Sequence, residues 1–534
     1  MRQTQSTLPS WRQAQSRRRQ HAGVVGLPFI VIATVYLAIA TAVGAVTASA
    51  LHNRSTAAAV HIVKPPRYLV LMVLDGARPD YLGEPGLPHL AQLEAQGMTY
   101  SNAIDGILEA ETPAGHATIA TGSRPDHDGV LGFDWVTDNT RYSVFDPSQM
   151  GTMQQIMESA GATTIAGLYK RKYPSAKVVA LSGHKYYAAA PLGGPSADAI
   201  IWYEGDSNNH YVPVGMPGHL PPSAVLNAPG LVYPTTRLPD GTEDHLATKL
   251  AIAAVRAMHP RLLLINYPEF DWPLGHVDGG PLNQAKVATD MQGWDADLGR
   301  IEELYRKEGI LDKTLFVITA DHGMMPIKHF VPATEIDDAI TSAGTTAPDI
   351  ATNSSDFIWL ADPTKAQTVT LNILAKRDPG IASAYYLTTV NGRPAYRSAG
   401  HLPPAMDQAN QYLLDALLNG HEPQVVVFGT EGTSFSDPST GWKADHGGNT
   451  WESQHVPLVL AGPGIRSGTS NAAVQLDDLA PTILADMGVR PSDMEGRVLT
   501  DALLTPKRSD VKARRTEIRS LDPIVTALRH ADSP

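Results

Sequence analysis

Four short runs of apolar residues, far apart in the chain, restrict the fold more than any other feature of this sequence. They are Tyr68–Leu74, Leu262–Ile265, Leu315–Thr319 and Pro457–Leu460. Each run is continuous rather than alternating, which is typical of a strand buried on both faces of a sheet. Between the runs lie stretches such as Asp290–Lys307, where apolar residues recur at helical spacing. Strands that alternate with helices predict an α/β fold, with a mostly parallel central sheet covered by helices on both faces.

This alternation begins near residue 67 and divides the 534-residue chain into segments. We expect a cytoplasmic segment at 1–21, a transmembrane anchor or signal sequence at 22–51, a linker at 52–66, a main domain at 67–503 and a charged tail at 504–534. Two stretches interrupt the alternation. We interpret both as inserts, one at about 170–245, rich in Gly, Pro and aromatic residues, and a cap region at about 350–440.

The N-terminal region has the pattern of a membrane segment. Arg12 and Arg17–Arg19 precede an apolar run at 22–51, and the next charged side chain is Arg54. The run is longer than the about 20 residues that a spanning helix needs. Because the arginines lie ahead of the run, we expect a single-pass anchor in the cell membrane with the rest of the chain outside the cytoplasm. Alternatively, cleavage after the small residues Ala48–Ala50 would release a secreted protein.

The charge and the cysteine content exclude several kinds of function. The formal net charge of −12 argues against a nucleic-acid-binding surface, which needs clustered Lys and Arg. The chain has no cysteine, which excludes disulfides, thiolate zinc sites and cysteine nucleophiles.

Acidic and histidine side chains follow the apolar runs where the predicted strands end. They are Asp75, Asp271, His276, Asp321 and His322, and a sixth residue, His446, lies ahead of the last run. Ligands bind beyond the carboxyl ends of the strands in open α/β sheets, so we expect these side chains to converge at one edge. Six nitrogen and oxygen ligands without a thiolate suit two divalent metal ions. Zn²⁺ is favoured, manganese or another first-row metal is the alternative, and calcium suits three imidazoles poorly.

Thr112 lies between an acidic stretch and small residues that open a helix, in the sequence "EAETPAGHATIATG". One interpretation is structural, in which Thr112 caps the helix and Pro113 takes its first turn. The other is catalytic, because a pair of metal ions can lower the pKa of a threonine hydroxyl and hold its oxygen in line with a phosphorus atom. The helix N-terminus would then also favour a bound phosphate.

Five motifs occur in the order found in one enzyme superfamily. They are "VLDGARPDYL", "ETPAGHATIATGSRPDHDGV", "DWPLGH", "ITADHGM" and "ADHGGNTWESQHVPLVLAGPGI". With these motifs the chain resembles the alkaline phosphatase superfamily, and within it the type I phosphodiesterases and nucleotide pyrophosphatases. The resemblance extends over roughly residues 66–500.

The resemblance implies an alkaline-phosphatase-like fold and a catalytic role for the domain at 67–503. It implies that Thr112 attacks phosphorus and forms a phosphothreonine, which water then hydrolyses. His116 also matches the family pattern, and we interpret it as structural. Two metal sites of three ligands each are implied, with Asp75, Asp321 and His322 at one and Asp271, His276 and His446 at the other.

Three positions depart from the family pattern. Asp271 and His276 are separated by one residue more than in the family, so a bulge around Pro273 would be needed to keep this metal site intact. Phe133 occupies the position of an asparagine that binds a phosphate oxygen, so a donor to the transition state is missing or replaced. Asp128 replaces a histidine, which we interpret as a structural change.

The segment His184–Tyr186 lies where related phosphomonoesterases have a Lys-x-Arg pair, which it does not reproduce. A phosphate monoester is a dianion and benefits from extra cations, whereas a diester carries one charge fewer. The missing pair and the missing asparagine therefore favour phosphodiesters or pyrophosphates. The candidate substrate-binding residues are Phe133, His184, Lys185 and Tyr186, of which Lys185 is a remaining cation.

The sequence thus predicts a membrane-anchored phosphohydrolase whose substrate is a small phosphate ester or pyrophosphate. Two alternatives within the superfamily are a phosphomonoesterase and a phospho-group transferase at the membrane surface. A non-catalytic protein that binds phosphorylated ligands is a third alternative, motivated by the Asp271–His276 spacing and by Phe133.

Overall fold

The computed structural model describes residues 64–137, 140–234 and 241–530 of the chain. The expected anchor at 22–51 lies outside these ranges, as do the expected cytoplasmic segment and most of the linker. Within the described ranges, no helix is both long enough and apolar enough to cross a membrane.

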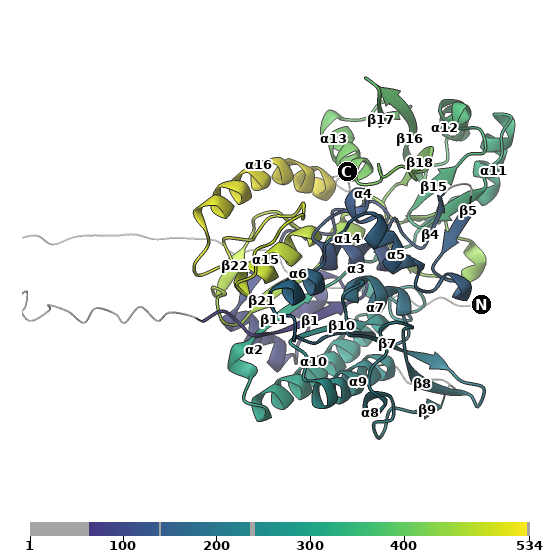
Figure 1. Cartoon of the computed structure of the whole chain (residues 1–534). Helices are drawn as coiled ribbons and strands as arrows, with labels where there is room; N and C mark the ends of the chain where they lie inside the picture. Colours follow the sequence, from purple (N-terminus) through teal and green to yellow (C-terminus); the bar gives the residue numbers. More distant parts are fainter. Residues whose placement is uncertain (1–63, 138–139, 235–240, 531–534) are drawn as a thin grey trace, which may run out of the picture. The chain divides into compact units, whose positions relative to one another are not determined.

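A ten-stranded sheet forms the centre of the structure (Figure 1). In spatial order its strands are β22 (Gly468–Ser470), β2 (Met98–Tyr100), β21 (Leu458–Ala461), β11 (Thr314–Thr319), β1 (Tyr68–Leu74), β10 (Leu262–Tyr267), β6 (Val178–Ser182), β7 (Ala199–Gly205), β8 (His210–Gly215) and β9 (Tyr233–Pro234). The strands from β11 to β7 are parallel, whereas β21 pairs antiparallel with β11, and β8 pairs antiparallel with β7. The sheet is therefore mixed, with a parallel centre.

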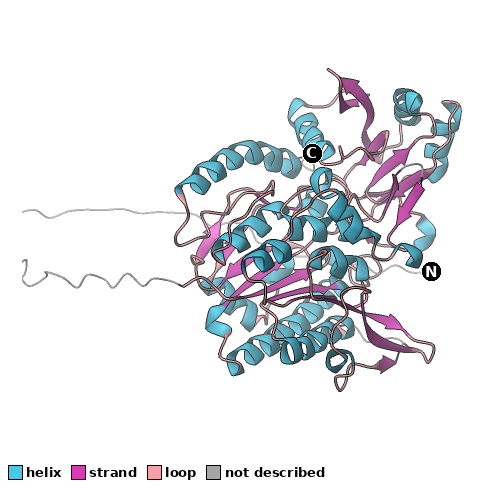
Figure 2. Ribbon diagram, in the orientation of Figure 1, coloured by secondary structure: helices cyan, strands magenta, loops and turns pink. Residues whose placement is uncertain are grey.

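Helices cover both faces of this sheet, as Figure 2 shows by colour and Figure 1 by label. One face carries α2 (Pro88–Gln96), α9 (Thr242–Met258) and α10 (Gln284–Lys307), and the other carries α3 (Thr112–Thr121), α6 (Ile165–Lys172), α7 (Tyr186–Gly193) and α15 (Leu479–Asp486). The residues of β1 and β10 are buried along almost their whole length because both faces of each strand are covered. The α/β class predicted from the continuous apolar runs is confirmed.

The stretch at about 170–245 was expected to be an insert, but part of it belongs to the central sheet. β6 pairs with β10, and β7 pairs with β6, both in parallel. The residues of β6 are all buried. Its apolar run is short and is surrounded by Gly, Pro and aromatic residues, which hid the strand in the sequence.

Residues 349–429 contain a second, antiparallel sheet with its own apolar core. In spatial order its strands are β14 (Asp349–Thr352), β15 (Ser355–Trp359), β18 (Val425–Gly429), β16 (Ile381–Val390) and β17 (Arg393–Ser398). Its helices are α11 (Ala333–Ser342), α12 (Ala366–Lys376) and α13 (Pro404–Asp415). Ile358, Val369 and Val427 belong to the buried cluster between this sheet and the helices α11 and α12.

Shorter elements connect the larger ones. The short helices are α4 (Pro125–Asp128), α5 (Thr152–Ser159), α8 (Ser223–Leu226) and α14 (Trp451–Gln454). The two-stranded pairs are β3 (Ala103–Ile104) with β23 (Val474–Gln475), β4 (Asp134–Thr137) with β5 (Thr140–Ser143), β12 (Met325–Pro326) with β20 (Ala444–Asp445), and β13 (His329–Phe330) with β19 (Thr433–Ser434).

The charged C-terminal tail forms the helix α16 (Arg508–His530), which packs against α13. Leu521 and Leu528 are buried on its inner side. Arg514 is also buried and donates to the carbonyl of Ala473 and to Glu517. Much of the charged tail expected at 504–534 is thus a helix packed against the domain.

Candidate metal centre and active site

The side chains at the strand ends meet at one edge of the central sheet. Asp75 follows β1 and Asp321 lies two residues beyond β11, and these parallel strands are neighbours. Asp271 lies beyond β10, the neighbour of β1 on its other side. His446 follows β20 and approaches from outside the sheet. The convergence expected at the carboxyl ends of the strands is what the structure contains.

Asp75, Asp321 and His322 form the first triad. All three are fully buried, and their ligand atoms lie close enough to hold one metal ion. His322 Nε2 is 3.6 Å from Asp75 Oδ1 and 3.5 Å from Asp321 Oδ2. The backbone N–H of Gly76 donates to Asp321 Oδ1 at 3.0 Å, which fixes that carboxylate.

Asp271, His276 and His446 form the second triad. Asp271 Oδ1 is 3.2 Å from His276 Nε2 and 3.7 Å from His446 Nε2. The extra residue between Asp271 and His276 is accommodated by a wide turn, in which the N–H of His276 donates to the carbonyl of Asp271 at 3.0 Å. Gly275 lies in this turn, where a Cβ would come within 2.7 Å of the Asp271 carbonyl oxygen.

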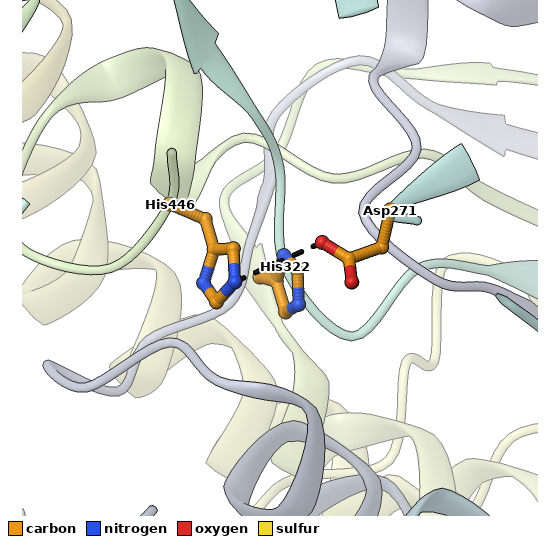
Figure 3. Close-up of side chains that lie close together, drawn as sticks. All are labelled: Asp271, His322 and His446. Atoms are coloured by element: carbon orange, nitrogen blue, oxygen red, sulfur yellow. Dashed lines mark ion pairs between the residues drawn. The ribbon is translucent and has the colours of Figure 1, made fainter. Parts of the chain in front are cut away.

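The two triads are adjacent. The rings of His322 and His446 are stacked, with centroids 3.8 Å apart. Asp271, His322 and His446 each offer a ligand atom within 4.8 Å of the others, although the sequence assigned them to different ions. Figure 3 shows these three side chains pointing toward one another from separate segments. Such proximity is expected of a centre that binds two ions about 4 Å apart.

Each histidine of the triads has the orientation that a metal ligand needs. Nδ1 of His276 lies 2.9 Å from the carbonyl of Ala444, Nδ1 of His322 lies 2.9 Å from the carbonyl of Gly323, and Nδ1 of His446 lies 2.9 Å from the carbonyl of Ala110. A carbonyl can only accept, so Nδ1 carries the proton and the lone pair is on Nε2, which faces the carboxylates. In the described part of the chain, His322 Nε2 has no hydrogen-bond partner. The donor set fits two divalent metal ions.

A further grouping contains Asp445 with His276 and His446. The oxygens of Asp445 are already engaged, because Oδ2 accepts from Ser434 at 2.6 Å and from Ser436 at 3.0 Å, and Oδ1 accepts from the N–H of His446 at 2.9 Å. Asp445 therefore supports His446 rather than offering a free ligand oxygen.

Lys185 lies between the two triads. Its Nζ donates to Asp75 Oδ1 at 2.8 Å and to Asp271 Oδ2 at 2.5 Å, and the side chain is 2% exposed. Burial alone would raise the pKa of Asp271, but the Lys185 ammonium holds that pKa well below its ordinary value. Burial and repulsion from Asp321 instead raise the pKa of Asp75. One ammonium thus offsets part of the negative charge gathered at the centre.

Thr112 is the first residue of α3 and not its cap, which contradicts the structural interpretation of this residue. The capping position is Glu111, and no side chain caps the helix. The hydroxyl of Thr112 donates to Asp75 Oδ1 at 3.3 Å, and Lys185 Nζ lies 3.4 Å from the same hydroxyl oxygen. Gly115, one turn later, lets α3 approach Asp321, since a Cβ there would lie 2.5 Å from the Asp321 carbonyl oxygen.

A cavity of about 420 Å³ opens onto the second triad and Lys185. Its walls are largely aromatic, with Phe133, Phe145 and Tyr187 in one cluster and Trp272 with Trp442 in another. This size and lining are usual for a small-molecule site. The space beside Lys185 therefore suits an apolar or planar group.

The sequence-predicted substrate residues fall in different places. Phe133, His184 and Lys185 line the cavity, and His184 pairs with Glu243. Tyr186 does not line it, because its hydroxyl donates to the carbonyl of Val144. Its neighbour Tyr187 lines the cavity instead.

Asn266 and His116 form a buried network beside the first triad, and neither was predicted as a catalytic, metal-binding or substrate-binding residue. Asn266 Nδ2 donates to Asp75 Oδ2 at 2.7 Å and lies 3.0 Å from His116 Nε2. His116 Nδ1 lies 2.8 Å from the carbonyl of Thr112. The network joins α3 to β10 behind the first triad, which agrees with a structural role for His116. Asn266 follows the apolar run at the end of its strand, so the strand-end rule that selected the aspartates could also have selected it.

Comparison with known proteins places the chain among phosphoesterases. The sequence model of the family described as Type I phosphodiesterase / nucleotide pyrophosphatase matches residues 69–447. The chain is 23% identical to alkaline phosphatase PhoV of Synechococcus elongatus, a match that covers 83% of this chain and 94% of that protein. It is 29% identical to alkaline phosphatase PhoK of a Sphingomonas species, over 26% of this chain and 27% of that protein.

Solved structures share the fold. The wild-type alkaline phosphatase PafA aligns with a TM-score of 0.66 at 16% identity, over 83% of this chain and all of that chain. An inactive variant of murine ectonucleotide pyrophosphatase / phosphodiesterase 5 in complex with AMP aligns with a TM-score of 0.55 at 16% identity, over 82% of this chain and all of that chain. The fold is therefore alkaline-phosphatase-like, as the sequence motifs implied.

Proposed function

Because the chain belongs to the type I phosphodiesterase / nucleotide pyrophosphatase family and is a hydrolase of phosphate esters, we propose that it cleaves phosphodiester or pyrophosphate bonds through a phosphothreonine intermediate. One observation carries the proposal. The hydroxyl of Thr112 lies beside the first triad and within 3.4 Å of Lys185 Nζ, and Lys185 itself lines the aromatic cavity. A nucleophile, a cation and two sets of metal ligands thus surround one point.

Asp75, Asp321 and His322 would hold one ion, and Asp271, His276 and His446 the other, with Zn²⁺ favoured by three imidazoles and no thiolate. Bound divalent ions supply Lewis-acid stabilisation of negative charge and lower the pKa of the nucleophile.

In the proposed reaction, Thr112 is the nucleophile and Lys185 is the cation. Thr112 Oγ1 forms a bond to phosphorus, the bond from phosphorus to the leaving oxygen breaks, and the proton lost from the Thr112 hydroxyl ends on that leaving oxygen. Lys185 stabilises the charge on the phosphoryl oxygens, which is the role expected of a buried cation 3.4 Å from the nucleophile. The oxygen of a water molecule then bonds to phosphorus, the bond from phosphorus to Thr112 Oγ1 breaks, and a proton of the water restores the hydroxyl.

Preference for diesters or pyrophosphates follows from the residues around the phosphoryl position. Phe133 has no side-chain donor, and its N–H donates to Glu111 at 2.7 Å. Tyr187 and Phe145 offer apolar surface beside Lys185. A second ester group would occupy this surface better than a dianionic phosphate that needs more cations.

A phosphomonoesterase is the second candidate, favoured by the buried Lys185 and by the named activity of PhoV and PafA. The two candidates separate in one assay. We expect the metal-loaded protein to have the higher kcat/KM on bis-p-nitrophenyl phosphate, and a higher value on p-nitrophenyl phosphate would favour the monoesterase.

Replacement of Thr112 tests the nucleophile. We expect Thr112→Ala to lose about a thousandfold or more of kcat while it keeps both metal ions, because the covalent step is removed. Thr118→Ala is the matched control, since Thr118 is also buried on α3 and its hydroxyl has no hydrogen-bond partner among the residues that the structure describes. Wild-type rates from the first variant, or no turnover of any diester or monoester by the wild-type protein, would refute the proposal.

We also propose that residues 22–51 anchor the protein in the cell membrane with the catalytic domain outside the cytoplasm. The apolar run and the arginines ahead of it support this orientation. Protease added to intact cells should degrade the catalytic domain and should spare an epitope attached to the N-terminus. Protection of the domain would contradict the orientation, and release of the domain into the medium would favour cleavage near Ala50.

A further inference from the structure

The turn between β14 and β15, Asn353–Ser354, lies inside the active site although it belongs to the second sheet. Asn353 is 2% exposed and Ser354 is 1% exposed. Asn353 also lines the aromatic cavity. A hairpin turn normally lies at the surface of a protein, so its burial here requires an explanation.

The Asn353 amide binds the loop that carries the nucleophile. Its Nδ2 donates to the carbonyl of Glu109 at 3.1 Å and to Glu111 Oε1 at 3.0 Å. Its Oδ1 accepts from the N–H of Ser355 at 2.8 Å, so the donors and the acceptor are all engaged. Glu111 directly precedes Thr112, and its other oxygen accepts from Phe133. The amide therefore holds two of the residues that lead into Thr112, the first residue of α3.

The same turn binds the loop that carries His446. The N–H of Ser354 donates to the carbonyl of His446 at 2.9 Å, and its hydroxyl donates to the carbonyl of Gly447. Gly447 has a φ of +85°, and a Cβ there would lie 2.4 Å from Asn353 Cγ. The side chain of Asn353 is thus packed directly against the backbone that follows His446.

The two loops also bind each other across this turn. Nδ1 of His446 donates to the carbonyl of Ala110 at 2.9 Å, and the N–H of Gly448 donates to the carbonyl of Leu108 at 2.9 Å. Any movement of the loop at 108–111 would therefore displace His446, and with it a ligand atom of the second triad. Asn353 contacts the point where these two loops meet.

From these contacts we propose that Asn353 is a positioning residue for the hydrolysis. Its amide binds the loop at 108–111 and its turn binds the loop that carries His446, and together these bonds fix Thr112 and His446 relative to each other. The expected effect of Asn353 on turnover rests on the proposed function, whereas its expected effect on the two loops does not. A displacement of about 1 Å between reacting groups can cost about a hundredfold in rate, so a residue that touches no substrate can control kcat.

The test compares Asn353→Ala with Asn372→Ala. Asn372 belongs to the same sheet region, on α12, and its Nδ2 donates to the carbonyl of Ala339 at 3.0 Å, so the control loses the same kind of bond away from the site. Asn353→Asp serves as a second variant, since it keeps the volume of the side chain and replaces the amide donor, and it replaces the first if Asn353→Ala does not fold.

We expect Asn353→Ala to lower kcat about tenfold or more, with KM changed less than about threefold, per folded and metal-loaded molecule. We also expect its dissociation constant for the more weakly held zinc ion to rise about tenfold, and amide exchange at 446–448 to accelerate. Asn372→Ala should change none of these. A variant with lowered melting temperature but unchanged kcat, zinc affinity and loop exchange would overturn the proposal and leave Asn353 a residue of stability alone.

Amide exchange at 446–448, which needs neither a metal ion nor turnover, separates this inference from the proposed function. If the wild-type protein turned over no phosphate ester, the proposed function would fail. Faster exchange at 446–448 in Asn353→Ala would still support the link between the loops, and unchanged exchange would overturn it.

Discussion

Lys185 places one positive charge among the carboxylates of the two triads. Its ammonium contacts one carboxylate from each triad and lies near the hydroxyl of Thr112. Removal of one partner from a buried charge pair leaves the other uncompensated, which is costly. Under the proposed function, this ammonium would also contact the phosphoryl oxygens of a substrate.

We therefore expect Lys185→Met to lower kcat/KM about a hundredfold or more, because a preorganised cation is lost from the transition state. Lys177→Met is the matched control. Lys177 lies directly before β6 and Lys185 shortly after it, but Lys177 pairs with Asp198 at an exposed position. Steady-state kinetics and metal analysis of both variants would check this. Equal kcat/KM for the two variants would show that Lys185 does not act on the reaction.

Asp128, the residue that replaces a histidine of the family, is expected to make the free energy of unfolding depend on pH. Burial raises its pKa to about 8, although the N–H of Val130 and the hydroxyl of Thr121 donate to it. The pKa in the unfolded chain is lower, so the folded protein holds the extra proton between about pH 4 and pH 8. This group therefore lowers the free energy of unfolding as pH rises through that window.

Asp128→Asn should remove this slope, because the amide does not titrate. The gain in the free energy of unfolding over the wild type should grow from about pH 5 to about pH 8 and then level off. Urea unfolding at several pH values would measure it. A parallel displacement of the two curves at every pH would contradict the role of Asp128.

At the scale of elements, the turn from Asp271 to His276 decides whether the second triad exists. Its backbone closes through the bond from the N–H of His276 to the carbonyl of Asp271. Gly275 permits this closure, since a Cβ would meet Met324 Cε at 2.4 Å and the Asp271 carbonyl oxygen at 2.7 Å. The side chain of Met324 can move aside, but the carbonyl cannot without opening the turn.

Gly275→Ala should therefore lower both the affinity of the second metal site and kcat/KM by about tenfold or more. Gly293→Ala is the control, since Gly293 is exposed on α10 with nothing within 4 Å of the added carbon. That change should instead stabilise the protein by about 0.5–1 kcal/mol, because alanine favours helix more than glycine. Zinc titration of both variants would decide, and equal affinities would refute the account of the turn.

The sequence predicted those strands that are buried on both faces, because such burial requires a continuous apolar run. The strands β1, β10, β11 and β21 were predicted because each is a continuous apolar run, and the six triad residues follow from the chemistry at strand ends. β6 was missed because its neighbours mask a short run. Asn353 could not be found, because its role depends on a turn that lies 242 residues after Glu111 in the sequence and packs against the loop ahead of Thr112. Tyr187 lines the cavity and the predicted Tyr186 does not, because the sequence does not show in which direction each side chain points at the start of α7.

At the scale of the whole described domain, α16 is joined to the domain by a buried cation. Arg514 lies within 3.5 Å of Asp478 and 3.6 Å of Asp501, and donates to Glu517 at 2.8 Å. These carboxylates surround Arg514 between α16 and the end of the central fold. Loss of the guanidinium would leave the buried carboxylate of Asp478 without this cation.

We expect Arg514→Met to lower the free energy of unfolding by about 3–5 kcal/mol, while kcat of the folded enzyme is unchanged. Arg515→Met is the adjacent control, since Arg515 is exposed on the same helix. Denaturant unfolding of both variants would measure the difference. Equal midpoints would show that α16 packs without the help of this cation.

The central claim is that two metal ions lie side by side within reach of Thr112. Anomalous diffraction at the zinc absorption edge, from crystals of the active zinc-loaded protein, tests it most directly. We predict two peaks about 4 Å apart, one surrounded by Asp75, Asp321 and His322 and the other by Asp271, His276 and His446. A single peak, or peaks bound by other residues in protein that hydrolyses phosphate esters, would contradict the account.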